Sequence, residues 1–514
     1  MNLSNQSFKL QMKINSLFID NYKLLKNFSV NFRSDVSILI GINGSGKSSI
    51  LEAIAQIFSD AFLNEKSKFG FRINYDLRLE EIIEQTATTS EFRTDYIRVE
   101  ISAKEKDSEL SFKVNTVDLT SNSEITIERR EEIESRFNKF ENILPSNIVI
   151  YYSGLSEEMK RICEPHDRIL SRQYREGNTN APRPVFYFEP ALFDLILLSL
   201  LSFEYGDIPE FLFEKAKIRS LQSVQLRLKK PEWVKQQKIA NWWGAKGEIK
   251  TFLDYLDSLG LPLTIEDISN RANIRGNVVI EAWQNEYLNI SIIGQPILFQ
   301  IRERFIEEKL LFKILNTLYI DGFLRNVEFS FANEAGKSFS VLSEGEQQIL
   351  TIKGIIELIT RENTLFLFDE PDTYLHPSWQ RSLIENIIQF NEKNDQILSQ
   401  FIITTHSPQL LSNANPEKSE AQILEDGEIV KITPKYYGKD ISTILYEMMG
   451  VERRNKKVAK ALSILFNLIE DEELNKAKLE YESLATLLGE DDPAIIRAKT
   501  QLIFLEEASN EKNK

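Results

Sequence analysis

The sequence has a single cysteine, Cys163, so no disulfide can form within the chain, as is usual in a reducing compartment. Only 20 glycines and 15 prolines occur in 514 residues, which excludes collagen-like and low-complexity architectures. The longest apolar run, Leu195–Leu201, is far shorter than the roughly 20 residues that span a bilayer. The first eleven residues are polar and lack the pattern of a signal peptide. We therefore expect a globular, cytoplasmic protein with no membrane segment.

Positive charge is also scarce, with 62 Lys and Arg against 77 Asp and Glu and a formal net charge of −15. Nucleic-acid binding needs clustered cations, so indiscriminate wrapping of nucleic acid is not expected. One region, Arg227–Lys250, is a candidate DNA or RNA surface, because its cations can neutralise phosphates and its indole rings can stack on bases. The alternative is a solvated helix face whose tryptophans lie in the core or in a protein interface. The residues concerned are Arg227, Lys229, Lys230, Lys235, Lys238, Lys246, Lys250, Trp233, Trp242 and Trp243.

The most informative stretch is a glycine-rich loop between a predicted strand, Val36–Ile40, and a predicted helix that follows Ser48. Its spacing, G-x-x-x-x-G-K-S over residues 41–48, predicts a phosphate-binding P-loop, whose backbone N–H groups face a triphosphate. Lys47 would reach the β- and γ-phosphates, and Ser48 would bind Mg²⁺. The alternative is a glycine turn before an ordinary helix. The residues expected to bind ATP are Asn43, Gly44, Ser45, Gly46, Lys47, Ser48 and Ser49.

A second apolar run, residues 364–368, ends in two carboxylates, Asp369 and Glu370. This pattern predicts a central parallel strand whose carboxyl end meets the nucleotide. Asp369 would hold Mg²⁺, and Glu370 would orient or deprotonate the attacking water. A strand that ends in an acidic surface turn is the alternative.

The segment Ser343–Gln347 precedes a predicted helix and offers a hydroxyl and backbone N–H groups to an anion. Ser343, Gly345 and Glu346 are therefore candidate ligands of a second phosphate, although the same residues also make an ordinary helix cap. One nucleotide needs only one P-loop. The second site is useful if it faces a nucleotide held by another copy of the chain.

A further buried strand, beginning at Phe401, ends at His406. His406 could hydrogen-bond a γ-phosphate and sense its loss, or it could simply cap the strand. His376 lies just after the carboxylates, where two copies of the chain would meet.

These four motifs, in this order, resemble those of the ABC-type ATPase family, in the soluble branch that includes SMC, RecF and OLD-like proteins. By position, residues 41–48 correspond to Walker A, 343–347 to the signature, Asp369 and Glu370 to Walker B with its catalytic glutamate, His406 to the switch histidine, and 372–376 to the D-loop. Glu344 replaces the glycine usual in transporters, which favours the SMC-like branch. The resemblance implies an Mg²⁺-dependent ATPase with catalytic residues Lys47, Glu370 and His406, in which two heads of a homodimer or larger oligomer sandwich ATP.

Residues 369–377 and 404–408 are also similar to those of stand-alone antiphage ATPases of the Septu and retron-associated kinds. That resemblance implies that the ATP state gates a separate effector, such as an HNH-type nuclease. OLD-type nucleases continue into an acidic metal-binding module whose carboxylate pattern is missing after Pro408, so no intrinsic nuclease is expected. The alternatives are a RecF-like or SMC-like ATPase that acts directly on DNA and a binding module in which ATP is structural.

The sequence thus predicts an α/β fold, an ABC-type P-loop NTPase head with a mostly helical insertion and a C-terminal helical hairpin. We expect residues 1–155 and 326–440 to form two ATPase lobes, 156–325 the insertion, and 441–514 the helical region. In that last region, Gly489 ends one predicted helix and Pro493 begins the next.

Overall fold

The computed structural model describes residues 12–85, 90–118, 123–154, 156–178, 182–234, 241–266, 271–273, 287–305, 307–333, 338–393, 399–431, 433–450 and 454–512. The chain divides into two compact units, residues 1–438 and 439–514. No helix in the described ranges is long and apolar enough to cross a membrane.

A seven-stranded sheet forms the centre of the first unit, with the order β19-β18-β3-β17-β16-β8-β9. All neighbours pair in parallel except β18 and β19. Strands β3, β16 and β17 are buried at every residue, which explains their continuous apolar runs. The strands are β3 (Val36–Ile40), β8 (Asn147–Tyr152), β9 (Val185–Tyr187), β16 (Thr364–Asp369), β17 (Gln400–Thr405), β18 (Ser419–Glu425) and β19 (Glu428–Ile429).

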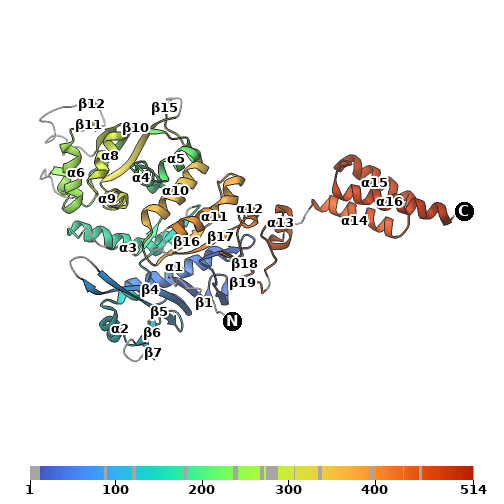
Figure 1. Ribbon diagram of the computed structural model, residues 1–514, viewed down its shortest axis with the longest axis horizontal. Helices are drawn as coiled ribbons and strands as arrows, with labels where there is room; N and C mark the ends of the chain where they lie inside the picture. The colour runs from blue at the N-terminus through green and yellow to red at the C-terminus, as the bar shows by residue number, and fades with distance from the viewer. Residues whose placement is uncertain are drawn as a thin grey trace. The chain divides into compact units, whose positions relative to one another are not determined.

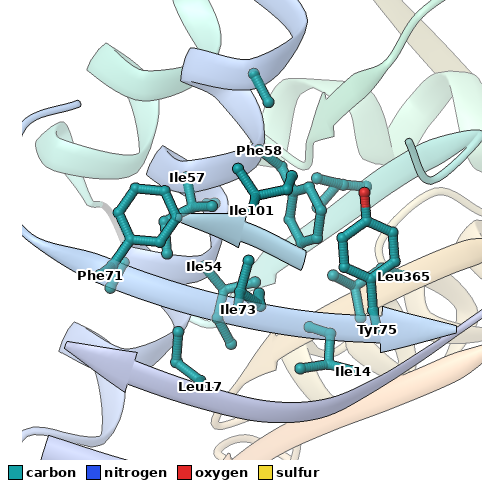
Figure 2. Packing of buried hydrophobic residues seen from close by; sticks show 14 of the residues in the cluster. Ile14, Leu17, Ile54, Ile57, Phe58, Phe71, Ile73, Tyr75, Ile101 and Leu365 are labelled. Carbon is teal, nitrogen blue, oxygen red and sulfur yellow. The ribbon is translucent and has the colours of Figure 1, made fainter. Parts of the chain in front are cut away.

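An antiparallel sheet of six strands, ordered β2-β1-β4-β5-β6-β7, lies on the other side of helix α1 (Lys47–Leu63) (Figure 1). Its strands β1 and β2 form an antiparallel hairpin. Figure 2 shows Ile54 and Phe58 of α1 packed with Ile73 and Tyr75 of β4 and with Leu365 of the central sheet. The helix therefore joins two sheets through one core. The strands are β1 (Lys13–Tyr22), β2 (Leu25–Asn31), β4 (Phe71–Gln85), β5 (Ser90–Ala103), β6 (Ser111–Asp118) and β7 (Ser123–Ile127).

The segment between the two expected lobes contains the helices that its apolar runs predict, and it also contributes to a sheet whose strands β14 and β15 extend into the expected second lobe. The order of this sheet is β12-β11-β13-β10-β14-β15, and its strand β10 pairs antiparallel with both β13 and β14. The helices are α3 (Glu157–Arg175), α4 (Phe193–Leu201), α5 (Ile208–Ala216), α6 (Gly247–Ser258), α8 (Gln295–Glu303) and α9 (Glu308–Ile320). The strands are β10 (Ser220–Lys229), β11 (Leu263–Glu266), β12 (Arg271–Asn273), β13 (Tyr287–Ile293), β14 (Leu324–Ala332) and β15 (Ser338–Phe339).

The second unit is helical, as expected, with α13 (Ile441–Met449), α14 (Lys456–Glu470), α15 (Leu474–Leu488) and α16 (Pro493–Lys512). The predicted hairpin is the α15–α16 pair, and α14 packs against it as a third helix around Leu465 and Ala498. Asp492 caps α16 through the backbone N–H of Ala494 and accepts two hydrogen bonds from the guanidinium of Arg454, at 2.7 and 2.8 Å. This paired contact fixes the start of the last helix.

Ile54 is completely buried between the two sheets, so Ile54→Ala should lower the free energy of unfolding by about 2 to 5 kcal/mol through lost burial and the cavity left behind. The matched control is Ile293→Ala, because Ile293 is 60% exposed, and it should change stability by less than about 0.5 kcal/mol. Urea denaturation measures both. Equal effects of the two substitutions would contradict the packing around α1.

Candidate active site

The loop between β3 and α1 has a backbone that only glycine accommodates at several positions. Gly44 and Gly46 have φ values of 81° and 105°, in the region that side chains disfavour. A β-carbon at Gly41 would lie 2.3 Å from the carbonyl oxygen of Leu424. The loop therefore curls tightly and directs the first N–H groups of α1 toward the carboxyl ends of the strands.

Lys47, the first residue of α1, is only 5% exposed. Its Nζ donates to the carbonyl oxygens of Gly41 at 2.8 Å and Ile42 at 3.2 Å, and it lies 3.1 Å from Nε2 of His406. Burial lowers the pKa of Lys47, and the charges of Glu370 and Asp369 act in the opposite direction. The lysine thus lies between the glycine loop and the two carboxylates.

Ser48 and Asp369 are in direct contact although 321 positions separate them in the sequence. Ser48 Oγ is 3.1 and 3.0 Å from the two carboxylate oxygens of Asp369, and the Thr404 hydroxyl also donates to this carboxylate. Burial raises the pKa of Asp369, whereas the hydrogen bonds from Thr404 and Ser48 lower it. A hydroxyl and a carboxylate side by side suit Mg²⁺, which prefers oxygen ligands and keeps several from water or phosphate.

Two further observations bear on which ligands the loop can hold. Ser45 Oγ is buried and has no hydrogen-bond partner among the described residues, so it remains able to donate to a phosphate oxygen. No group of three or more His, Cys, Asp or Glu side chains in the described ranges could hold a metal by itself.

Glu370 and His406 form a pair at the ends of neighbouring strands. His406 Nε2 lies 2.7 Å from Glu370 Oε1. This hydrogen bond is the main cause that lowers the pKa of Glu370, so the side chain is an ionised carboxylate near neutral pH. Glu370 also has a φ of 49°, which is unusual for a side chain of this size and is typical of strained residues at functional sites.

Ser343, Gly345 and Glu346 lie at the start of helix α10 (Glu344–Ile359) and form a helix cap. The backbone N–H and the hydroxyl of Ser343 both donate to the Glu346 carboxylate at 2.7 Å, and Ser343 Oγ accepts from the Glu346 backbone N–H. Ser343 is exposed. Within the described residues, no hydrogen bond or ion pair joins these three residues to the P-loop of the same chain. The structure thus brings five of the predicted residues together, and residues 343–346 form a helix cap of their own.

Gln348 links the signature helix to the turn after β16, a role that the sequence motifs did not predict. Its side chain is buried, donates to the carbonyl oxygen of Pro371 at 2.7 Å and accepts from the backbone N–H of Tyr374 at 2.9 Å. In the same turn, Asp372 accepts a hydrogen bond from the Thr405 hydroxyl at 2.8 Å. The only signal in the sequence was the position of Gln348 one helical turn after the cap.

Tyr152 is a second residue that the motifs missed. It ends β8 and pairs in register with Asp369 of β16. Burial raises the pKa of its phenol to about 12, with smaller contributions from the charge of Asp369 and from hydrogen bonds with Ser48 and Asp369. The sequence marked it only as the last residue of a strand.

The Arg227–Lys250 region has the features of its structural alternative. Trp242 and Trp243 are 1% and 5% exposed, and Trp233 Nε1 donates to the carbonyl oxygen of Asp321. Lys229 pairs with Glu232, and Lys250 pairs with Asp254. Lys235 and Lys238 lie outside the described residues. The predicted stacking surface is therefore wrong for Trp242 and Trp243, whose rings are packed in the core.

Comparisons with known proteins show which family and which relatives the chain is similar to. Residues 12–411 match the AAA ATPase domain family. The chain is 29% identical over 185 residues to the retron Ec83 probable ATPase of Escherichia coli, covering 33% of each protein. It is 26% identical over 181 residues to the Septu protein PtuA of Bacillus thuringiensis, covering 34% of this chain and 39% of the relative. The chain therefore spans about a third of the length of these curated relatives, and the expected resemblance to retron and Septu ATPases is confirmed.

Solved structures with a similar fold include the SMC head domain from Thermotoga maritima, which is 12% identical with a TM-score of 0.30. That likeness covers 82% of this chain and 100% of the SMC head. The recombination mediator protein RecF bound to ATP is 14% identical with a TM-score of 0.29, and the likeness covers 82% of this chain and 100% of RecF.

Burial raises the pKa of Asp372 from its ordinary value of 3.8 to about 6. The folded state then binds this proton more tightly than the unfolded state, so the stabilisation is complete below pH 3.8 and is lost as the pH rises through 6. Asp372→Asn removes this dependence. The stability of the variant relative to the wild type should increase by about 2.5 kcal/mol between pH 4 and pH 8, since one pKa unit corresponds to about 1.4 kcal/mol and the shift is nearly complete at pH 4. Urea denaturation at several pH values measures the difference, and the exposed Asp257→Asn should show no such trend.

Proposed function

We propose that this chain, which belongs to the AAA ATPase domain family, binds and hydrolyses ATP. We also propose that the nucleotide controls the association of two copies. The observation that carries this proposal is the convergence of Lys47, Ser48, Asp369, Glu370 and His406 at the carboxyl ends of adjacent strands. In parallel sheets this edge is where ligands bind.

The P-loop would hold the phosphates of ATP. The N–H groups at the start of α1 and the buried Ser45 hydroxyl supply hydrogen-bond donors, and Lys47 supplies a positive charge. Ser48 and Asp369 would hold Mg²⁺ at the same edge. When bound, the ion would neutralise phosphate charge during hydrolysis.

The Glu370 carboxylate would orient the attacking water and accept its proton. Its lowered pKa keeps it ionised, and the hydrogen bond to His406 fixes its direction. His406 also lies next to Lys47 Nζ, so it is positioned to contact the same terminal phosphate. The pair would therefore couple the state of the phosphate to the position of the base.

The exposure of the signature supports the proposed association of two copies. Each chain supplies one P-loop and one exposed Ser343 at the start of α10. A second phosphate-binding helix start has no use within one copy that already has a P-loop. We propose that the α10 helix start of one protomer closes over the nucleotide of its partner, as the resemblance to SMC-like heads implies.

The relatives belong, by their names, to a retron and to the Septu system. We propose accordingly that nucleotide-dependent association of the heads gates a separate effector in antiphage defence, with an HNH-type nuclease as the first candidate. Direct action on DNA through the Arg227–Lys250 region is less favoured, because Trp242 and Trp243 are buried and Lys229 and Lys250 are in ion pairs.

Substitutions of Lys47 and Glu370 should separate binding from hydrolysis. Lys47→Ala should lose both ATP binding and turnover, because a buried cation that faces the phosphates is removed. Glu370→Gln should keep binding but reduce turnover on the order of 10²- to 10⁴-fold, the usual contribution of a general base. Steady-state phosphate release and equilibrium binding of ATP measure the two effects. The exposed Glu385→Gln is the control, and wild-type turnover in both site variants would remove the assignment.

Ser343→Arg tests the association of the heads separately from ATP binding. Introduced into Glu370→Gln protein, it should leave ATP binding intact while abolishing the ATP-dependent increase in mass, because a bulky cation replaces the hydroxyl at the proposed contact. Light scattering with and without ATP and Mg²⁺ gives the mass. ATP-dependent association that survives this substitution would refute the role of the signature.

A further inference from the structure

A basic cavity of about 380 Å³ lies at the opposite edge of the central sheet from the P-loop. Four cationic side chains line it, Arg183, Lys309, Lys313 and Arg361, together with one carboxylate, Glu307. They come from the segment before β9, from α9 with the residue before it, and from the turn after α10. In a chain with a formal net charge of −15, this is an unusual concentration of positive charge.

The carboxylates around the cavity do not balance these cations. Arg183 Nη2 donates to Asp167 at 2.8 Å, which accounts for one cation. Glu307 can offset one of the remaining three, Lys309, Lys313 and Arg361. Burial lowers the pKa of Lys313, the negative charge of Glu248 raises it, and the positive charge of Arg361 lowers it. Glu248 thus compensates part of the charge of Lys313, and one positive charge in excess remains on the lining, which a bound anion would neutralise.

Unused hydrogen-bonding groups accompany the charges. Arg183 Nε and Nη1 are buried and have no hydrogen-bond partner among the described residues, although Nη2 is bound to Asp167. Asn316 is 6% exposed, and its Oδ1 is likewise without a partner within the described ranges. Buried polar atoms are normally satisfied, so donors and an acceptor that remain unsatisfied beside one cavity indicate a ligand.

The carboxyl end of α10 could in principle account for the cations, because Leu358 and Ile359 also line the cavity. A helix end carries roughly half a negative charge, however, which is less than the excess of about one positive charge. The Ile359 carbonyl oxygen already accepts a hydrogen bond from Asn147 Nδ2 at 3.1 Å. Helix capping therefore explains only part of the charge.

We propose that this cavity binds a small phosphate-bearing ligand at a site separate from the P-loop. Guanidinium and ammonium groups recognise phosphate oxygens with strong, charge-assisted hydrogen bonds. The volume lies in the range of small-molecule sites and exceeds what one phosphate needs, so the ligand has room for a further group. Asn316 Oδ1 would accept a hydrogen bond from a hydroxyl or amine of that group.

The ligand would contact the turn that joins α10 to β16. Arg361 lies in this turn, just before the first residue of β16, whereas Asp369 is the last residue of that strand. At about 3.3 Å per residue, β16 is roughly 17 Å long, so at least that length separates the two ends. The site is thus distinct from the P-loop and is built on a connection between the signature helix and the acidic strand.

Calorimetric titration of the full chain tests the proposal, with inorganic pyrophosphate and adenosine monophosphate as probes. The protein carries Lys47→Ala so that the P-loop contributes little. We expect saturable binding of at least one probe. The double substitution Lys313→Ala/Arg361→Ala should lower the affinity at least about tenfold, because each substitution removes a charge-assisted contact to the probe. Tighter binding of adenosine monophosphate would identify a phosphate ester, and tighter binding of pyrophosphate would identify a bare polyphosphate.

The matched control is Lys113→Ala/Arg129→Ala, which removes one exposed lysine and one exposed arginine from the same unit and should leave binding unchanged. Thermal melting checks that each variant is folded. If the double variant unfolds, the half-buried Lys309→Ala takes its place and should weaken binding several-fold. The absence of saturable binding by either probe, or equal loss in the control, overturns the proposal.

Discussion

The contact between Ser48 and Asp369 is the constraint on which the rest of the head depends. Asp369 is 3% exposed, so the free energy of burying its carboxylate must be offset by hydroxyl donors from Ser48 and Thr404. Those donors can meet it only if β17 lies between β3 and β16, all three parallel and in the observed register. One buried carboxylate therefore links a motif near residue 48 with strands formed more than 300 residues later.

The sequence predicted the parts of the site that are local. A glycine loop after an apolar strand, or a carboxylate pair at a strand end, can be recognised from about ten consecutive residues. It did not predict the sheet around β10, because that strand finds its partners β13 and β14 far along the chain. Tyr152 was missed for the same reason, since only the register of β8 with β16 places it beside Asp369. The sequence left open whether Trp242 faces a nucleic acid or lies in the core, because charge surrounds it in sequence, and the structure shows that its ring is buried.

The start of α10 shows how one sequence can serve two purposes. Ser343 and Glu346 satisfy each other in a capping box, which stabilises the helix within a single copy. The same hydroxyl and N–H groups are the donors that a phosphate would use, so a phosphate and the Glu346 carboxylate compete for them. In the proposed dimer, the cap would keep the helix start formed until an anion with more charge replaces the carboxylate. Gln348 donates a hydrogen bond to Pro371 in the turn after β16. This bond links the position of the helix start to the position of the acidic strand.

The far ends of the same elements are joined just as firmly. Thr364 Oγ1 lies 2.5 Å from Asn147 Oδ1, and Asn147 Nδ2 donates to the carbonyl oxygen of Ile359, so β16, β8 and α10 share one buried hydrogen-bond network. Helix α10 is thus tied to the acidic strand at both ends, by Gln348 near the proposed nucleotide site and by Asn147 near the basic cavity. Because packed elements tied in this way move as units, a force on α10 at either end must displace β16 or strain these bonds. A displacement at either end of α10 would therefore act on the strand that carries Asp369.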